Sequence, residues 1–226
     1  MDKALKERAS RIIQILKRQY PQSKIALEHS NPLEILVATI LSAQCTDKRV
    51  NMVIQKLFKK YRAVKDYAEA DLGVFEREIR STGFYKNKAK NIINAAKKII
   101  SDFGGEVPGE MEKLITLPGV ARKTANIVLY SGFGKIEGIA VDTHVKRLSQ
   151  RLGLSKFEDP VKIEQDLMQL VPKKDWGVIS FLLIDHGRRI CGAKKPLCGQ
   201  CALAKLCPSA KMERWGLSPT QIVNFH

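Results

Sequence analysis

Four of the five cysteines gather near the C-terminus, and their spacing is the strongest chemical signal in the sequence. They are Cys191, Cys198, Cys201 and Cys207, with six, two and five residues between successive members. Thiolates are soft ligands, and four of them on one short stretch can enclose a single metal centre. Zinc sites usually bring their ligands as two close pairs, whereas only one close pair occurs here. The pattern favours a four-iron, four-sulfur cluster, with a structural zinc ion or two disulfides as the alternatives.

A second pattern combines a short apolar stretch, a tight turn and a cationic helix start. Leu117 closes one helix, residues 118–121 form the turn, and a second helix is expected over 122–133. Such a helix–hairpin–helix exposes backbone N–H groups at the start of its second helix, where they and the helix dipole attract a DNA phosphate. Gly119 in the turn and Arg122 beside it belong to this anion site. An ordinary corner between two helices is the alternative.

The residues after the turn raise a structural concern and a chemical one. Ala121 stands where such a turn usually has a second glycine, and because alanine tolerates positive φ poorly, this departure counts against the hairpin pattern. Lys123 lies in the first turn of the second helix, where a cation opposes the helix dipole. It either binds phosphate as an ordinary ammonium or, as a neutral amine favoured by its surroundings, attacks an electrophilic carbon.

Two further polar residues precede the next expected helix, over 145–152. Asp142 is suited to cap that helix, which by itself would explain its presence. A capping carboxylate that also faced Lys123 would stabilise a sugar cation or relay protons. His144 either contacts a phosphate or packs as an ordinary histidine.

Composition narrows the class of partner. The chain has 226 residues, with 39 lysines and arginines against 23 acidic residues, a formal net charge of +16. Such an excess favours a nucleic acid partner, because each neutralised phosphate releases counterions. A basic protein without such a partner is the alternative. No secretory signal or membrane-length apolar run is recognised, so we expect an intracellular protein in a reducing compartment, which in a prokaryote would be the cytoplasm or nucleoid.

The elements that must position these residues are helices. Apolar residues recur at helical spacing and strand-like alternation is scarce, so the fold class is expected to be all-α. Helix starts are predicted at Asn31, Thr46, Asp159 and Asp175, each a good N-cap residue. Gly83 and Gly104 are expected to bracket a lysine-rich helix.

The chain closely resembles the endonuclease III family of DNA glycosylases, which have a helix–hairpin–helix and an iron–sulfur cluster. The resemblance rests on residues 117–125, on residues 141–144 and on the cysteine spacing, in that order, and it extends over nearly the whole chain. It implies two helical lobes with a DNA-binding groove between them. Residues 25–135 would form the lobe with the hairpin, and residues 1–24 with 136–226 the lobe with one 4Fe–4S cluster.

The resemblance also implies a reaction. The enzyme would flip a damaged nucleotide out of double-stranded DNA, while Gln44 and Phe84 fill or flank the vacated space. Leucine is common in the family where Phe84 stands. Lys123 would attack the sugar and Asp142 would stabilise the developing charge, which predicts a bifunctional glycosylase and abasic-site lyase for oxidised or ring-saturated pyrimidines. The protein is expected to be a monomer that binds DNA with damaged bases or abasic sites and no membrane.

Three alternatives remain open from the sequence. A mismatch-directed thymine or uracil glycosylase, or one for oxidised guanine, would keep the fold and change the pocket. A non-catalytic DNA-binding protein would use the hairpin only to grip phosphate. The cysteine site would also suit a redox sensor, although Lys194 and Lys195 lie on the loop between Cys191 and Cys198, where a bound cluster would hold them rigidly for phosphate contact.

Overall fold

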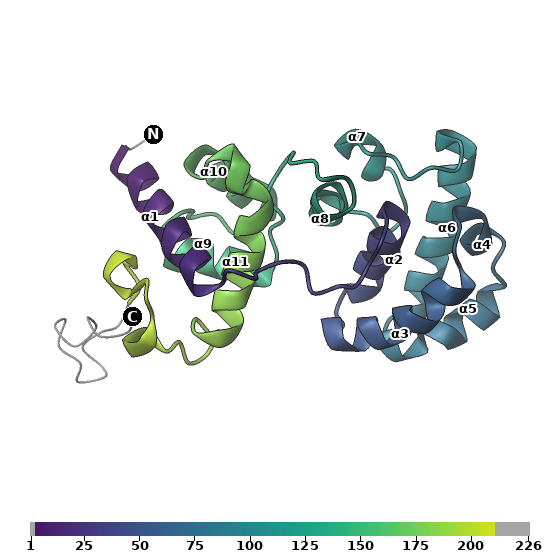
Figure 1. Ribbon diagram of the computed structural model, residues 1–226, viewed down its shortest axis with the longest axis horizontal. Coiled ribbons are helices and arrows are strands. Elements are labelled where there is room, and N and C mark those ends of the chain that lie inside the picture. Colours follow the sequence, from purple (N-terminus) through teal and green to yellow (C-terminus); the bar gives the residue numbers. More distant parts are fainter. Residues whose placement is uncertain (1–2, 211–226) are drawn as a thin grey trace. The chain divides into compact units, whose positions relative to one another are not determined.

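The computed structural model describes residues 3–210, and the regular elements in that range are all helical (Figure 1). This confirms the expected all-α class. The chain divides into two compact units, which we call the hairpin unit (Ile25–Glu137) and the cysteine unit (Met1–Lys24 with Gly138–His226). The predicted division into two lobes, residues 25–135 and residues 1–24 with 136–226, stays a prediction. Residues 211–226 of the expected cluster lobe lie outside the described part of the chain.

The hairpin unit is organised around one buried helix. Its elements are α2 (Pro32–Ser42), α3 (Asp47–Lys60), α4 (Val64–Ala68), α5 (Leu72–Ile79), the 3-10 turn η1 (Arg80–Thr82), α6 (Tyr85–Phe103), α7 (Met111–Leu114) and α8 (Arg122–Phe133). Residues 35–41 of α2 are all buried, as expected for a helix that is apolar on every face. It packs against α3, α6 and α8 and so forms the centre of this core.

The helix starts of this unit follow the sequence signals. The side chain of Asn31 accepts a hydrogen bond from the Glu34 amide at 2.9 Å, and that of Thr46 accepts one from the Arg49 amide at 3.3 Å. Both satisfy N–H groups that lack a partner within the helix. Gly104 ends α6 with a φ of +65°, the left-handed conformation that glycine adopts readily.

Within residues 3–24 and 138–210, the cysteine unit contains four α-helices and three short 3-10 turns. They are α1 (Lys3–Gln19), α9 (Thr143–Arg151), α10 (Pro160–Leu170), η2 (Lys173–Asp175), α11 (Trp176–Arg189), η3 (Cys198–Gln200) and η4 (Ala204–Leu206). Both α10 and α11 pack against α1 and α9, and these four helices enclose a second core. Arg8 of α1 donates hydrogen bonds to the carbonyls of Gly153 and Leu206 at 3.1 and 3.0 Å, which ties α1 to the end of α9 and to η4.

One predicted cap is wrong in its chemistry. Asp175 does precede α11, but its side chain makes no capping hydrogen bond and its backbone is helical, with φ −103° and ψ −5°. An N-cap side chain reaches the first-turn N–H groups from an extended backbone, which Asp175 lacks. It instead accepts a hydrogen bond from Lys17 of α1 at 2.5 Å. In the described part of the chain, no helix is both long and apolar enough to cross a membrane.

Candidate functional site

The predicted hairpin forms between α7 and α8, and two buried apolar side chains anchor its turn. Leu117 and Val120 point into the core, with 2% and 6% of their surface exposed. Gly119 has a φ of +79°, and a Cβ added there would lie 2.9 Å from the Cβ and the Nδ2 of Asn91 on α6. The turn therefore requires glycine at this position twice over, for its backbone conformation and for its close approach to α6.

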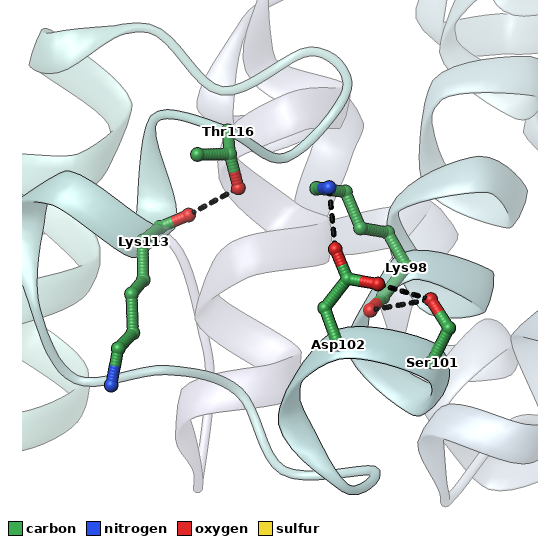
Figure 2. A network of polar contacts seen from close by, with 5 residues as sticks. All are labelled: Lys98, Ser101, Asp102, Lys113 and Thr116. Carbon is green, nitrogen blue, oxygen red and sulfur yellow. Dashed lines mark hydrogen bonds and ion pairs between the residues drawn. The ribbon is translucent and has the colours of Figure 1, made fainter.

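Polar contacts fix the ends of the two helices that come before the turn. Figure 2 shows Lys98, near the end of α6, with its ammonium 2.6 Å from the Asp102 carboxylate. This hydrogen bond, with a second one from Ser101, holds the pKa of Asp102 below its usual value. After α7, Thr116 donates to the Lys113 carbonyl at 2.8 Å (Figure 2). The chain thus leaves each helix in a defined direction.

The objection that Ala121 raises to the hairpin pattern does not apply, because this residue does not have a positive φ. Its φ is −93° and its ψ is 170°, an extended conformation that alanine adopts without strain. Ala121 is the N-cap residue of α8 and has no polar side chain with which to cap the helix. The first-turn N–H groups of Lys123 and Thr124 are consequently open to an anion, as the predicted phosphate site requires.

The position of Lys123 follows from the burial of the opposite face of α8. Ala125, Val128 and Leu129 are fully buried, and α8 packs on α2. Lys123 lies on the outer side of the first turn and is exposed. Its amine can therefore reach a ligand bound at the helix N-terminus.

Gln44 and Phe84 share an uncommon backbone conformation. In residues 3–210 they are the only non-glycine residues with positive φ, at +53° and +48°. The left-handed conformation costs a residue with a Cβ about 1–2 kcal/mol, and it is rarest for bulky side chains. Both residues are exposed, and Phe84 keeps 63% of its surface in solvent. Such strain concentrates at functional sites, and here it falls on the two residues that the resemblance assigns to the flipped-out nucleotide.

Asp142 is the N-cap of α9, as its position predicts. One carboxylate oxygen accepts a hydrogen bond from the Val145 amide at 2.8 Å. No described residue hydrogen-bonds its other oxygen, so the cap leaves one acceptor for a ligand. Because Asp142 caps it, α9 begins at Thr143, two residues before the predicted start.

His144 packs against α11 and is oriented by a neighbouring arginine. Arg147 donates to its Nδ1 at 3.1 Å, and because a guanidinium only donates, the ring proton belongs on Nε2. A Cβ at Gly187 of α11 would lie 2.8 Å from that Nδ1. Burial lowers the pKa of His144, and the nearby Asp142 opposes the shift. His144 is thus packed against α11 through its Nδ1 side, and its Nε2–H is left as a potential donor, so a phosphate contact by this residue stays a prediction.

The four clustered cysteines line one cavity of about 550 Å³, together with Lys194 and Lys195. All are free thiols, so the alternative of two disulfides does not hold in this structure. Among residues 3–210, no three Cys, His, Asp or Glu side chains are close enough to hold a single metal ion. A donor set of four thiols on one cavity fits an iron–sulfur cluster.

The electrostatics of this cavity point the same way. Burial, with smaller contributions from the other three cysteines, raises the pKa of the Cys201 thiol to about 11. Four thiolates therefore need compensating positive charge, which metal ions would supply. Arg151 of α9 donates to Cys191 Sγ at 3.3 Å and to the Gly192 carbonyl at 2.8 Å, and so holds the start of the loop that carries both lysines. Lys194 and Lys195 are exposed on that loop.

Reasoning from the sequence missed one residue of the hairpin unit. Lys88 is 4% exposed, and its ammonium donates to the carbonyls of Leu41 and Thr82 at 2.7 and 2.8 Å. The sequence did indicate that Lys88 is buried, because it precedes Ile92 by one helical turn and so lies on the same buried face of α6. A lysine on the apolar stripe of a helix is rarely buried without a specific partner.

Comparison with known proteins agrees with these patterns. A model of the HhH-GPD superfamily of base excision DNA repair proteins matches residues 37–173. The endonuclease III of Synechocystis sp. is 57% identical over 206 residues, covering 91% of this chain and 94% of that protein. The endonuclease III of Bacillus subtilis is 48% identical over 200 residues, covering 88% and 91%.

Solved structures give the same result. A trapped covalent intermediate of endonuclease III with DNA superposes with a TM-score of 0.87 at 41% identity, covering 92% of this chain and 98% of that one. Sequence, motifs and fold agree over nine tenths of the chain. The protein belongs to the HhH-GPD superfamily of base excision DNA repair proteins and, within it, to the endonuclease III family.

Proposed function

We propose that this protein is a bifunctional DNA glycosylase and abasic-site lyase that removes oxidised or ring-saturated pyrimidines from double-stranded DNA. The observation that carries the lyase assignment is the exposed Lys123, in the first turn of α8 and directly after the hairpin. An amine beside an anion-binding helix N-terminus is suited to attack a sugar whose phosphate is held there.

Lys123 is the nucleophile in this proposal. Its neutral amine attacks the anomeric carbon, the bond to the damaged base breaks, and the base leaves with a proton. The sugar ring then opens to a protonated Schiff base. Loss of a proton from the adjacent C2′ expels the 3′-phosphate by β-elimination, and water hydrolyses the imine to regenerate the lysine. Base excision and strand cleavage therefore use one side chain.

Asp142 stabilises the positive charge that develops on the sugar and assists proton transfer. Its capping hydrogen bond fixes one oxygen, and the other is the acceptor that this role needs. His144, through Nε2–H, and the hairpin N–H groups bind phosphates. Gln44 and Phe84 occupy the space that the flipped nucleotide leaves.

Cys191, Cys198, Cys201 and Cys207 would hold one 4Fe–4S cluster, since they line a single cavity and their burial requires positive charge. When bound, the cluster would act as a scaffold and cross-link the C-terminal loop. Lys194 and Lys195 would then contact the DNA backbone from a fixed position. Protein purified without oxygen should show iron–sulfur absorption that Cys198→Ser abolishes, and stoichiometric zinc would overturn this assignment.

The decisive test is borohydride trapping on a panel of duplexes containing thymine glycol, mismatched thymine or uracil, 8-oxoguanine, or an abasic site. We expect a covalent adduct with thymine glycol and with the abasic site, and none with Lys123→Ala. Lys113→Ala, an exposed lysine of α7, is the matched control and should trap like wild type. Trapping by Lys123→Ala would refute the nucleophile, and release of only mismatched bases or 8-oxoguanine would refute the substrate class.

A further inference from the structure

Lys88 is a buried cation whose partners are neutral. Its ammonium donates to the Leu41 and Thr82 carbonyls at 2.7 and 2.8 Å, and among the described residues no carboxylate pairs with it. Burial lowers the pKa of this lysine, and the nearby Cys45 opposes the shift. Burying an ammonium is costly unless its hydrogen bonds are satisfied, and an apolar side chain of similar length would avoid that cost. The core of the hairpin unit therefore does not need a lysine for packing alone.

The two carbonyls belong to helix ends. Leu41 is in the last turn of α2, and Thr82 is the last residue of η1. Terminal carbonyls lack partners within their helices and form the negative end of the dipole, so a cation is favoured there. One ammonium satisfies two such ends that are far apart in the sequence.

The segments that leave these ends carry the two strained residues. Gln44 follows Leu41 by three positions, and Phe84 follows Thr82 by two. Both have positive φ, and both are exposed. Strained conformations persist only where their surroundings fix them, and Lys88 joins the backbones on which these conformations are built.

We propose that Lys88 is a positioning residue, which holds the Gln44 and Phe84 segments in the geometry that supports the extruded nucleotide. This inference rests on the proposed glycosylase function. Lys88 itself contacts neither the DNA nor the reacting atoms. Without its ammonium the two segments would relax independently, and the enzyme would lose flipping before it lost the chemistry of Lys123.

The test compares Lys88→Met with Lys90→Met, which removes an exposed lysine of the same helix. Excision of thymine glycol from duplex DNA under single turnover should slow about 10- to 100-fold in K88M, and less than about 2-fold in K90M. Fluorescence of 2-aminopurine beside the lesion, which reports unstacking, should fall in parallel. Trapping on single-stranded abasic DNA, which requires no flipping, should change less than about 2-fold in both variants.

A double-mutant cycle separates positioning from a general loss of structure. In a Gln44→Ala/Phe84→Ala background, K88M should slow excision by no more than about 2-fold, because the groups on which it acts are gone. Hydrogen exchange should lose protection at residues 42–46 and 82–85 and keep it elsewhere in the hairpin unit. If K88M does not fold, Lys88→Leu, which also removes the donor, takes its place in every assay.

The outcomes distinguish this inference from the function on which it depends. Wild-type protein that neither excises nor traps would refute the proposed function. Active wild type with K88M excising at the same rate would refute the role of Lys88 alone. Additive effects in the cycle, or loss of protection across the whole unit, would mean that Lys88 only stabilises the fold.

Discussion

The hairpin turn makes a quantitative prediction for Gly119→Ala. The substitution places a Cβ in a backbone with φ +79° and 2.9 Å from two atoms of the Asn91 side chain. The left-handed conformation costs alanine about 1–2 kcal/mol, and overpacking at a rigid contact adds about 1–3 kcal/mol. We therefore expect the free energy of unfolding to fall by about 2–5 kcal/mol, with a drop in Tm of at least about 4 °C.

Gly105→Ala is the matched control, because it separates the two contributions. Gly105 also has a positive φ, +86°, but a Cβ there would meet nothing within 4 Å. The Gly105→Ala substitution should therefore lower the free energy of unfolding only by the cost of the left-handed conformation, about 1–2 kcal/mol. Urea unfolding followed by circular dichroism gives both values, and the difference between the variants measures the contact with Asn91.

The same pair tests the assignment of the phosphate site. A turn displaced from α6 would misdirect the N–H groups of α8, so Gly119→Ala should weaken binding of abasic-site duplex beyond its effect on folding. Binding is measured by fluorescence anisotropy at a temperature where both variants are folded. Equal losses of stability in the two variants would refute the close approach, and unchanged DNA affinity in Gly119→Ala would refute the phosphate site.

Three further predictions follow from the cysteine unit. Asp142→Asn should retain the helix cap and keep the free energy of unfolding within about 0.5 kcal/mol, but it should lower the rate of single-turnover excision by about 100-fold or more. Asp142→Ala should in addition lose about 1 kcal/mol of stability by urea unfolding. Full activity in Asp142→Asn would show that the residue is only a cap. Lys194→Ala/Lys195→Ala should reduce the slope of log DNA affinity against log salt concentration by about 1.8. Lys3→Ala/Lys6→Ala is the charge-matched control. An unchanged slope would contradict the contact of Lys194 and Lys195 with the DNA backbone. Burial holds the folded pKa of His144 below its unfolded value of about 6.5. The stability that the neutral ring contributes is therefore fully present above pH 6.5, and it is lost as the pH falls from 6.5 toward the folded pKa. His144→Asn should therefore have a shallower loss of urea midpoint between pH 7.5 and 5 than wild type, and parallel curves would refute the lowered pKa of His144.

Much of the local structure was predictable because its signals are local. The bounds of α3 and α8 agree with the sequence prediction, since each starts at a residue with extended backbone and continues through an uninterrupted apolar face. The spacing of the cysteines and the order of the motifs likewise identified the family without coordinates. The N-cap residues were predicted less reliably. Asp175 pairs with the distant Lys17 instead of capping its helix, and no neighbouring residue in the sequence indicates that contact.

By itself, the sequence determined the helical class, the hairpin, the cysteine cluster and the residue types that can do the chemistry, since these depend on period, spacing and short-range hydrogen bonds. Tertiary structure decided the rest. It gave Ala121 an extended backbone, placed the strain on Gln44 and Phe84, and buried Lys88 between the ends of α2 and η1. Each of these features depends on which distant segment packs against the residue. Contacts between segments far apart in the chain produce no periodic pattern in the sequence of either segment.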